Sequence, residues 1–140
     1  MQRKASAVWK GGLKDGKGTV SSASGVLSNT PYSFTTRFEN APGTNPEELI
    51  AAAHAGCFTM ALAFALQAAG LTADSLETTS TITLDVSGTA PTITSSHLEL
   101  KAKIPGIDNA KFQEIAKGAE QGCPVTRVLK AEVTLDATLL

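Results

Sequence analysis

Alternation of hydrophobic and polar residues predicts six β-strands along the chain. In the third of them, aromatic side chains fall on one face, while Arg37 and Glu39 fall on the other. In the fifth, aliphatic side chains share one face, and His97 lies among charged residues on the outer face. The expected strands are Lys4–Lys10, Gly18–Ser22, Tyr32–Glu39, Leu76–Val86, Thr92–Ile104 and Glu132–Leu139.

A long hydrophobic segment that begins at Pro46 carries the start signals of an α-helix. Asn45 can cap it, and the two glutamates that follow Pro46 suit the positive end of the helix dipole. Gly70 stops the helix after about Ala69, which makes it about 24 residues and about 36 Å long. The helix is apolar on nearly every side, and one subunit of this size hardly covers it. The sequence therefore predicts a homodimer with this helix at its centre.

A second helix is expected from Asp108 or Asn109 to Gly122, followed by a short turn at Val125–Lys130 and the last strand. The strands are thus grouped rather than strictly alternating with helices. This order predicts an α+β fold with a mostly antiparallel sheet. The length of 140 residues fits one domain that spans residues 1–140.

Composition narrows the class of protein. The 12 basic residues are balanced by 13 acidic ones, whereas a nucleic-acid-binding protein needs a basic surface to neutralise phosphates. The high hydrophobic fraction, 42% against 18% charged residues, excludes a disordered chain. Two cysteines and two histidines are too few for a disulfide scaffold and show no zinc-ligand spacing, so we expect no nucleic acid and no metal.

The stretch Leu49–Ala69 has no charged residue and is long enough to span a membrane. It is mostly alanine and is interrupted by His54, Thr59 and Gln67, which predicts a soluble protein without a membrane partner. The basic N-terminus has no apolar run behind it, which predicts no signal peptide and a cytoplasmic location. Thiols are kept reduced there, so a disulfide would be transient.

The two cysteines are the first candidates for chemistry, as a redox couple, as inert thiols or as metal ligands. Cys57 lies in the middle of the long helix, where a buried inert thiol is the plain interpretation. Cys123 lies between Gly122 and Pro124, a turn position where a space-filling role is less natural. His54 shares a helical face with Cys57, which permits a Cys/His nucleophile pair, although a core histidine is the simpler interpretation.

The remaining polar candidates have plain interpretations too. Arg37 and His97 are solvated side chains on the polar faces of strands, and Glu47 is a favourable charge in the first helical turn. The pattern of residues alone therefore specifies no reaction.

Two motifs then give the chain a resemblance to a known family. Gly43–Phe58, with the sequence GTNPEELIAAAHAGCF, resembles the signature helix of the OsmC/Ohr family, the osmotically inducible and organic hydroperoxide resistance proteins. Gly122–Thr126 (GCPVT) is similar to the second family motif, and Thr36–Phe38 (TRF) to its strand element. The similarity extends over essentially the whole chain. It is closer to the OsmC branch, because Arg37 lies in the strand expected before the helix.

The resemblance implies a cytoplasmic thiol peroxidase that reduces organic hydroperoxides. Cys57 would be the peroxidatic cysteine, Cys123 the resolving cysteine, and Arg37 with Glu47 the polar part of the site. It also implies the OsmC-like fold, in which sheets wrap around long central helices in an intertwined homodimer with two active sites at the interface. The family uses no metal or bound cofactor, and an external dithiol, a lipoylated protein in related reductases, supplies the electrons.

Physical chemistry adds one constraint to this assignment. Attack on a peroxide needs a thiolate, and Cys57 is too far along its helix for the dipole to stabilise one. The guanidinium of Arg37, oriented by Glu47, is the expected stabiliser. Glu47 and Cys57 are ten residues apart, about 15 Å along one helix. Either Arg37 spans that separation, or Glu47 comes from the partner subunit.

Two other classes of function stay open at this point. A non-enzymatic dimeric binding module would hold a hydrophobic ligand in an apolar crevice and leave both thiols inert. A Cys/His hydrolase would pair Cys57 with His54 and leave the second cysteine unused. In a peroxidase the crevice would favour bulky peroxides, and we expect its walls to include Phe58, Met60 and Ala61.

Overall fold

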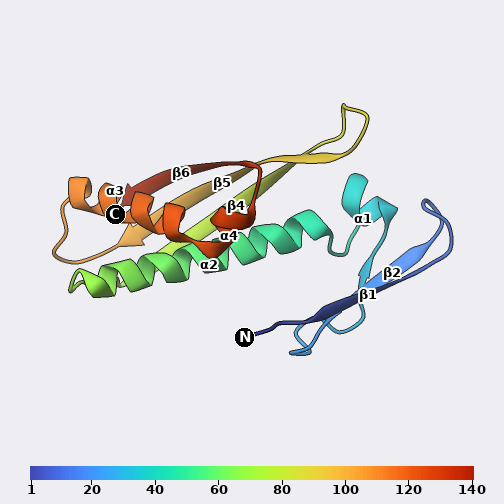
Figure 1. The fold of residues 1–140 in the computed structure, drawn as a ribbon, viewed down its shortest axis with the longest axis horizontal. Helices are drawn as coiled ribbons and strands as arrows, with labels where there is room; N and C mark the ends of the chain where they lie inside the picture. The colour runs from blue at the N-terminus through green and yellow to red at the C-terminus, as the bar shows by residue number, and fades with distance from the viewer. The chain divides into compact units, whose positions relative to one another are not determined.

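The computed structural model describes all 140 residues and divides them into two compact units, Met1–Leu49 and Ile50–Leu140. Each unit contains one three-stranded sheet (Figure 1). Helix α2 (Pro46–Ala68) begins at the end of the first unit and continues into the second. The predicted α+β class is therefore confirmed.

The sheet of the first unit is antiparallel, in the order β1 (Ala5–Lys10), β2 (Lys17–Ser22), β3 (Thr30–Tyr32). Gly18 pairs with Trp9 on one neighbouring strand and with Tyr32 on the other, whose rings lie 5.4 Å apart. A side chain at position 18 would collide with both rings, so glycine allows this aromatic contact. All of β1 is exposed in the single chain.

The strand predicted at Tyr32–Glu39 is wrong beyond its first residue. Phe34–Phe38 forms the short helix α1 instead, with Ser33 as its N-cap. The Ser33 hydroxyl accepts a hydrogen bond from the Thr36 N–H, and the Thr36 hydroxyl accepts one from the Ser33 N–H. This reciprocal capping box favours a helix over the strand that the alternating pattern indicates. Phe34 and Phe38, one helical turn apart, pack against each other and support the helix. Arg37 therefore projects from a helix.

The second unit is built on a sheet in the order β4 (Ser75–Asp85), β5 (Thr92–Lys103), β6 (Glu132–Leu139). β4 and β5 are antiparallel, whereas β6 is parallel to β5, so the sheets are mostly antiparallel, as predicted. The crossover from β5 to β6 contains α3 (Asn109–Gly122) and α4 (Pro124–Val128). The turn predicted after Pro124 is thus a short helix.

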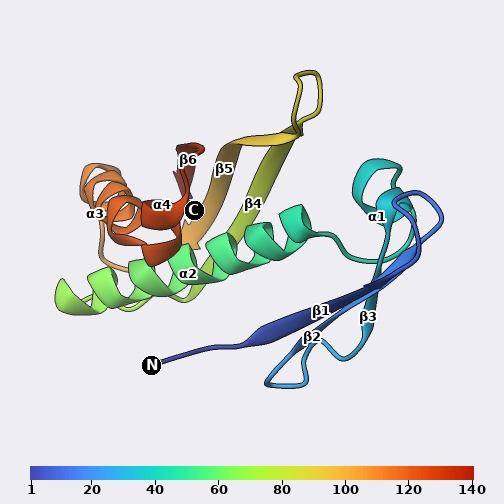
Figure 2. The same cartoon turned by 45° about the vertical axis from the view of Figure 1, so that its right-hand side comes forward.

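Helices α2 and α3 cover one face of this sheet and share its hydrophobic core (Figure 2). Each element contributes the residues that its amphipathic period turns inward. The buried core residues are Phe58, Leu62, Leu66, Leu98, Leu100, Ala102, Ile104, Phe112, Ala116, Ala119 and Cys123.

Helix α2 buries only part of its surface in a single chain. It is long and apolar enough, by length and composition, to cross a membrane, yet only 22% of its most apolar window is buried. Met60 and Phe64 are 75% and 76% exposed. One face of α2 packs on the sheet, and the opposite face lacks a covering element within its own unit.

Candidate active site

The two cysteines, 66 positions apart in the sequence, lie side by side in the second unit. The Sγ atoms of Cys57 and Cys123 are 3.0 Å apart, and both thiols are free. A disulfide needs about 2.05 Å between its sulfurs, so a small movement of either side chain would close one. This proximity favours the redox couple among the alternatives for the two cysteines.

Cys123 is held by the junction of two helices. Its N–H donates to the Glu120 carbonyl at the end of α3, and its carbonyl accepts from the Arg127 N–H of α4. Pro124 fits the first position of α4, where no N–H donor is needed. The junction folds into the core, so Cys123 is fully buried and Cys57 half-buried. The turn position therefore places the Cys123 thiol in the core.

The surroundings of Cys57 within its unit disfavour a thiolate. Burial raises the pKa of Cys57, and its hydrogen bond with Cys123 raises it further. The backbone N–H of Val125 donates to the Cys57 sulfur and lowers the pKa in part. None of these groups is a cation, so activation of this thiol needs a positive charge from elsewhere.

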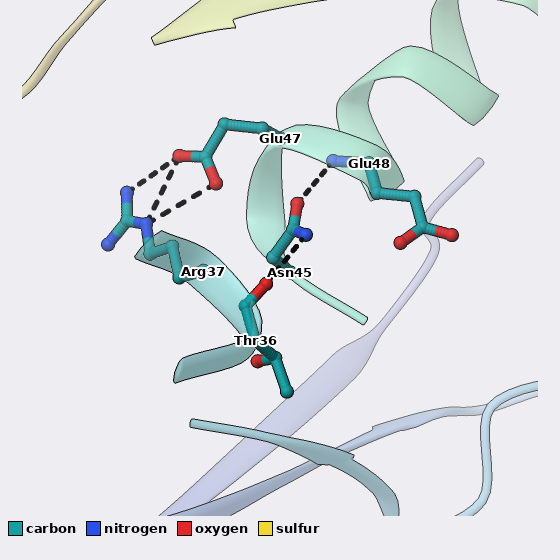
Figure 3. Close-up of polar contacts among 5 residues, drawn as sticks. All are labelled: Thr36, Arg37, Asn45, Glu47 and Glu48. Carbon is teal, nitrogen blue, oxygen red and sulfur yellow. Dashed lines mark hydrogen bonds and ion pairs between the residues drawn. The ribbon is translucent and has the colours of Figure 1, made fainter. Parts of the chain in front are cut away.

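Arg37 and Glu47 form a multiple ion pair in the first unit, as Figure 3 shows. Arg37 Nη2 lies 2.8 Å from Glu47 Oε1, and Nε lies 3.2 and 3.3 Å from the two carboxylate oxygens. Glu47 is 8% exposed and fixes the guanidinium, which keeps Nη1 outside the ion pair. The expectation that Glu47 orients Arg37 agrees with this geometry.

Asn45 supports this ion pair through two hydrogen bonds. Its Oδ1 accepts from the Glu48 N–H at 2.8 Å, which is the predicted cap of α2 (Figure 3). Its Nδ2 donates to the Thr36 carbonyl in α1 at 3.1 Å, a contact that the sequence pattern did not indicate. Asn45 therefore connects the helix that carries Arg37 to the helix that carries Glu47.

Arg37 also lines a pocket of about 320 Å³ with mostly aromatic walls. Its other lining residues are Trp9, Leu13, Tyr32, Ser33, Phe34, Phe38 and Pro46.

An apolar groove of about 660 Å³ adjoins Cys57 between α2 and α3. Met60 and Ala61 line it, as expected, whereas Phe58 does not. Phe58 is fully buried, because it lies on the face of α2 that packs against the sheet. The groove is lined by Cys57, Met60, Ala61, Phe64, Ala65, Ile115, Gly118, Ala119, Gly122 and Pro124.

His54 is fully buried and uses both ring nitrogens. Nδ1 lies 2.7 Å from Ser96 Oγ, and Nε2 lies 2.8 Å from Thr126 Oγ1. Burial lowers the pKa of His54, and the negative charge of Glu120 opposes this only in part. At neutral pH the ring is therefore uncharged and engaged with hydroxyls, which supports the core-histidine interpretation and disfavours a Cys/His nucleophile pair.

His97 lies on the outer face of the second sheet, where it contacts Thr134 Oγ1 at 2.6 Å and Asp136 Oδ2 at 3.3 Å. Its side chain is 34% exposed and is therefore partly solvated, in line with the solvated side chain expected from the sequence. No group of three or more His, Cys, Asp or Glu side chains converges on a point where a metal ion could bind.

The chain thus combines an α+β fold with two adjacent free thiols, one of which lines an apolar groove. The sequence profile of the OsmC family, described as OsmC-like protein, matches residues 38–138. The chain is 51% identical to Peroxiredoxin OsmC of Escherichia coli over 139 residues, which covers 99% of this chain and 97% of the relative. It is 34% identical to the organic hydroperoxide resistance protein of Xanthomonas axonopodis pv. citri over 101 residues, 69% and 67% of the two chains. The chain belongs to the OsmC-like family, and the higher identity confirms the OsmC branch.

Solved structures agree with this assignment. The organic hydroperoxide resistance protein OhrB of Bacillus subtilis superposes with a TM-score of 0.67 at 25% identity, covering 98% of both chains. An OsmC-like protein of Vibrio cholerae superposes with a TM-score of 0.78 at 15% identity, covering 99% of both chains. The predicted OsmC-like fold is therefore confirmed.

Proposed function

We propose that this protein is a thiol peroxidase that reduces organic hydroperoxides through Cys57 and Cys123. The main support is the 3.0 Å separation of the two sulfurs, together with the apolar groove that Cys57 lines. The family and the names of its relatives, a peroxiredoxin and an organic hydroperoxide resistance protein, support the activity. A binding module with inert thiols has no need for this pairing.

The reaction divides between the two sulfurs. The Cys57 thiolate attacks one peroxide oxygen, the O–O bond breaks, and the departing alkoxide takes up a proton to leave as an alcohol. Cys57 is then a sulfenic acid. The Cys123 sulfur displaces its hydroxyl, which leaves as water, and a disulfide forms. An external dithiol, which family resemblance suggests is a lipoylated protein, reopens that disulfide in the cytoplasm by thiol–disulfide exchange.

Arg37 is the cation that we assign to the Cys57 thiolate. It is always charged, and the pKa of Cys57 is raised by its own surroundings, so the thiol needs such a partner. Arg37 is bound to Glu47 in the first turn of α2, ten residues before Cys57. Because a helix separates such positions widely, we infer that the partner subunit of a homodimer supplies the Arg37–Glu47 pair.

We expect the protein to be a homodimer in which α2 of one chain packs on α2 of the other. A side chain at Gly56 meets nothing within 4 Å in the single chain, so Gly56→Leu would stabilise a monomer through helix propensity. In a dimer with closely packed helices the same change would prevent association. Sedimentation equilibrium of wild type and Gly56→Leu measures this.

Gly118→Leu is the matched control, because Gly118 lies within α3 with equally open surroundings. It should leave the oligomeric state unchanged. A wild-type protein that sediments as a folded monomer at micromolar concentration would contradict the dimer.

We expect cumene and tert-butyl hydroperoxides to react faster than hydrogen peroxide. The chemistry at Cys57 is the same for all three, so selectivity comes from the groove, where each buried methylene contributes about 0.8 kcal/mol. Second-order rate constants under one dithiol reductant test this. Ile115→Ala, which shortens a groove wall, should slow cumene hydroperoxide by about tenfold and leave hydrogen peroxide unchanged. Equal constants for all three peroxides in the wild type would mean that the groove does not bind the substrate.

A further inference from the structure

A buried chain of hydroxyl groups runs from the second sheet through His54 to α4. Ser80 Oγ lies 3.2 Å from Ser96 Oγ, which contacts His54 Nδ1, and His54 Nε2 contacts Thr126 Oγ1. Both His54 and Ser96 are fully buried. A hydroxyl can donate or accept, so either neutral tautomer of the ring is satisfied by this chain. His54 thus connects three separate segments of the unit.

The end of this chain lies next to the reacting sulfurs. Thr126 follows Val125, whose N–H donates to Cys57, and comes three residues after Cys123. His54 is three residues before Cys57 on α2. The hydrogen bond between His54 and Thr126 therefore joins the two segments that carry the two cysteines.

Helix α4 is held by Val125, which packs against the hydrophobic core, and by the hydrogen bond of Thr126 to His54. It has five residues, none of them fully buried, and its N-cap makes no side-chain hydrogen bond. Thr126 is the residue of α4 whose side chain hydrogen-bonds to another element. This part-buried hydrogen bond is therefore the side-chain polar contact that fixes α4, and it influences how closely Cys123 stays against Cys57.

We propose that His54 and Thr126 are positioning residues for the resolving step, holding Cys123 within reach of the Cys57 sulfenic acid. This role rests on the two-cysteine reaction proposed above. In that step the Cys123 sulfur forms the S–S bond, the S–O bond of Cys57 breaks, and the hydroxyl leaves as water with the Cys123 proton. A second peroxide competes for the same sulfenic acid and converts it to sulfinic acid, releasing another alcohol.

The position of Cys123 decides whether the Cys57 sulfenic acid forms the disulfide or is oxidised again. Disulfide closure is a step within one chain, whereas the second oxidation becomes faster as peroxide concentration rises. If α4 moves away from His54, disulfide closure slows. The Cys57 sulfenic acid then survives longer, so a larger share of it reacts with a second peroxide. The peroxide concentration at which half of Cys57 becomes sulfinic acid should therefore fall.

Thr126→Val tests this, because valine keeps the shape of threonine and removes the hydroxyl. The proteins are treated with a series of cumene hydroperoxide concentrations, and mass spectrometry measures the disulfide and the sulfinic acid. We expect the half-oxidation concentration to fall about fivefold, the effect of losing one ordinary hydrogen bond. Thr126→Ser restores the hydroxyl and should behave as the wild type.

Thr59→Val is the matched control. Thr59 Oγ1 on the same helix contacts Thr78 Oγ1 in β4 at 2.7 Å, so the substitution removes a comparable bond with no connection to α4. It should leave the half-oxidation concentration unchanged, even if thermal stability falls. A general loss of stability would instead affect both valine variants alike and would overturn the positioning role.

Two outcomes separate the proposals from each other. If wild type closes the disulfide and Thr126→Val closes it equally well, the positioning role is wrong and the two-cysteine reaction stands. If wild type forms no Cys57–Cys123 disulfide with peroxide, the proposed function itself fails. Thr126→Ala, whose shorter side chain also lacks the hydroxyl, provides the same measurement if the valine variant does not fold.

Discussion

Cys57→Ser is expected to abolish peroxide turnover, whereas Cys123→Ser should still consume one equivalent of peroxide. Cys57 makes the first bond to the peroxide, so nothing replaces it, and a serine hydroxyl is not ionised at neutral pH. Cys123 acts only after that step. Turnover with a dithiol reductant, and mass spectrometry after one equivalent of cumene hydroperoxide, measure the two effects.

The serine variants are also controls for each other. Each replaces a sulfur by an oxygen at one end of the same 3.0 Å contact, so each removes the sulfur pair while keeping the other thiol. In Cys123→Ser, Cys57 should carry a sulfenic acid or an overoxidised form. If it stays a free thiol, the roles are wrongly assigned. The wild type should lose both free thiols with peroxide, which an inert binding module would not.

Local signals were sufficient to predict the long helix and the strands of the second unit. Asn45 and Pro46 give α2 its start, and the alternation in β5 places its core face correctly. These elements follow from short-range patterns whose period matches the structure that they form. The same patterns do not show that Cys57 and Cys123 meet, because the contact depends on the crossover from β5 to β6. Only resemblance to a family indicated that pair.

Three features of the site could not be predicted from periodicity. The helix around Arg37 depends on a capping box that begins at Ser33, and the aromatic alternation concealed it. Phe58 follows Cys57 directly, so the two side chains face different sides of α2, and Phe58 belongs to the core. Asn45 makes a second hydrogen bond to α1 that only tertiary structure brings about.

Arg37→Ala should slow the reaction with cumene hydroperoxide by about 10²-fold. The pKa of Cys57 is raised by burial and by its contact with Cys123, so loss of the cation leaves the thiol protonated over a wider pH range. The rate should therefore rise with pH through a midpoint that lies higher in the variant than in the wild type. Stopped-flow rate constants between pH 5 and about 9 measure both effects.

The effect of Arg37→Ala on the reaction rate must be separated from its effect on stability. Glu47 is 8% exposed and would be left without its cation in this variant. An unpaired buried charge costs about 1–3 kcal/mol or more, which thermal unfolding would detect. The double variant Arg37→Ala/Glu47→Ala removes both charges and should recover stability while the reaction stays slow. Recovery of the rate in the double variant would mean that Arg37 serves the fold and not the thiolate.

Mixing the inactive Cys57→Ser variant with the slow Arg37→Ala variant tests which subunit supplies the guanidinium to each Cys57. Cys57→Ser chains keep Arg37, and Arg37→Ala chains keep Cys57, so neither homodimer has a complete site. If the partner subunit supplies the guanidinium, unfolding and refolding the two together forms heterodimers with one complete site, and activity returns. If each chain uses its own Arg37, the mixture stays as slow as its components. We expect activity to return, because Arg37 is bound by Glu47 at the start of the helix that carries Cys57 further along.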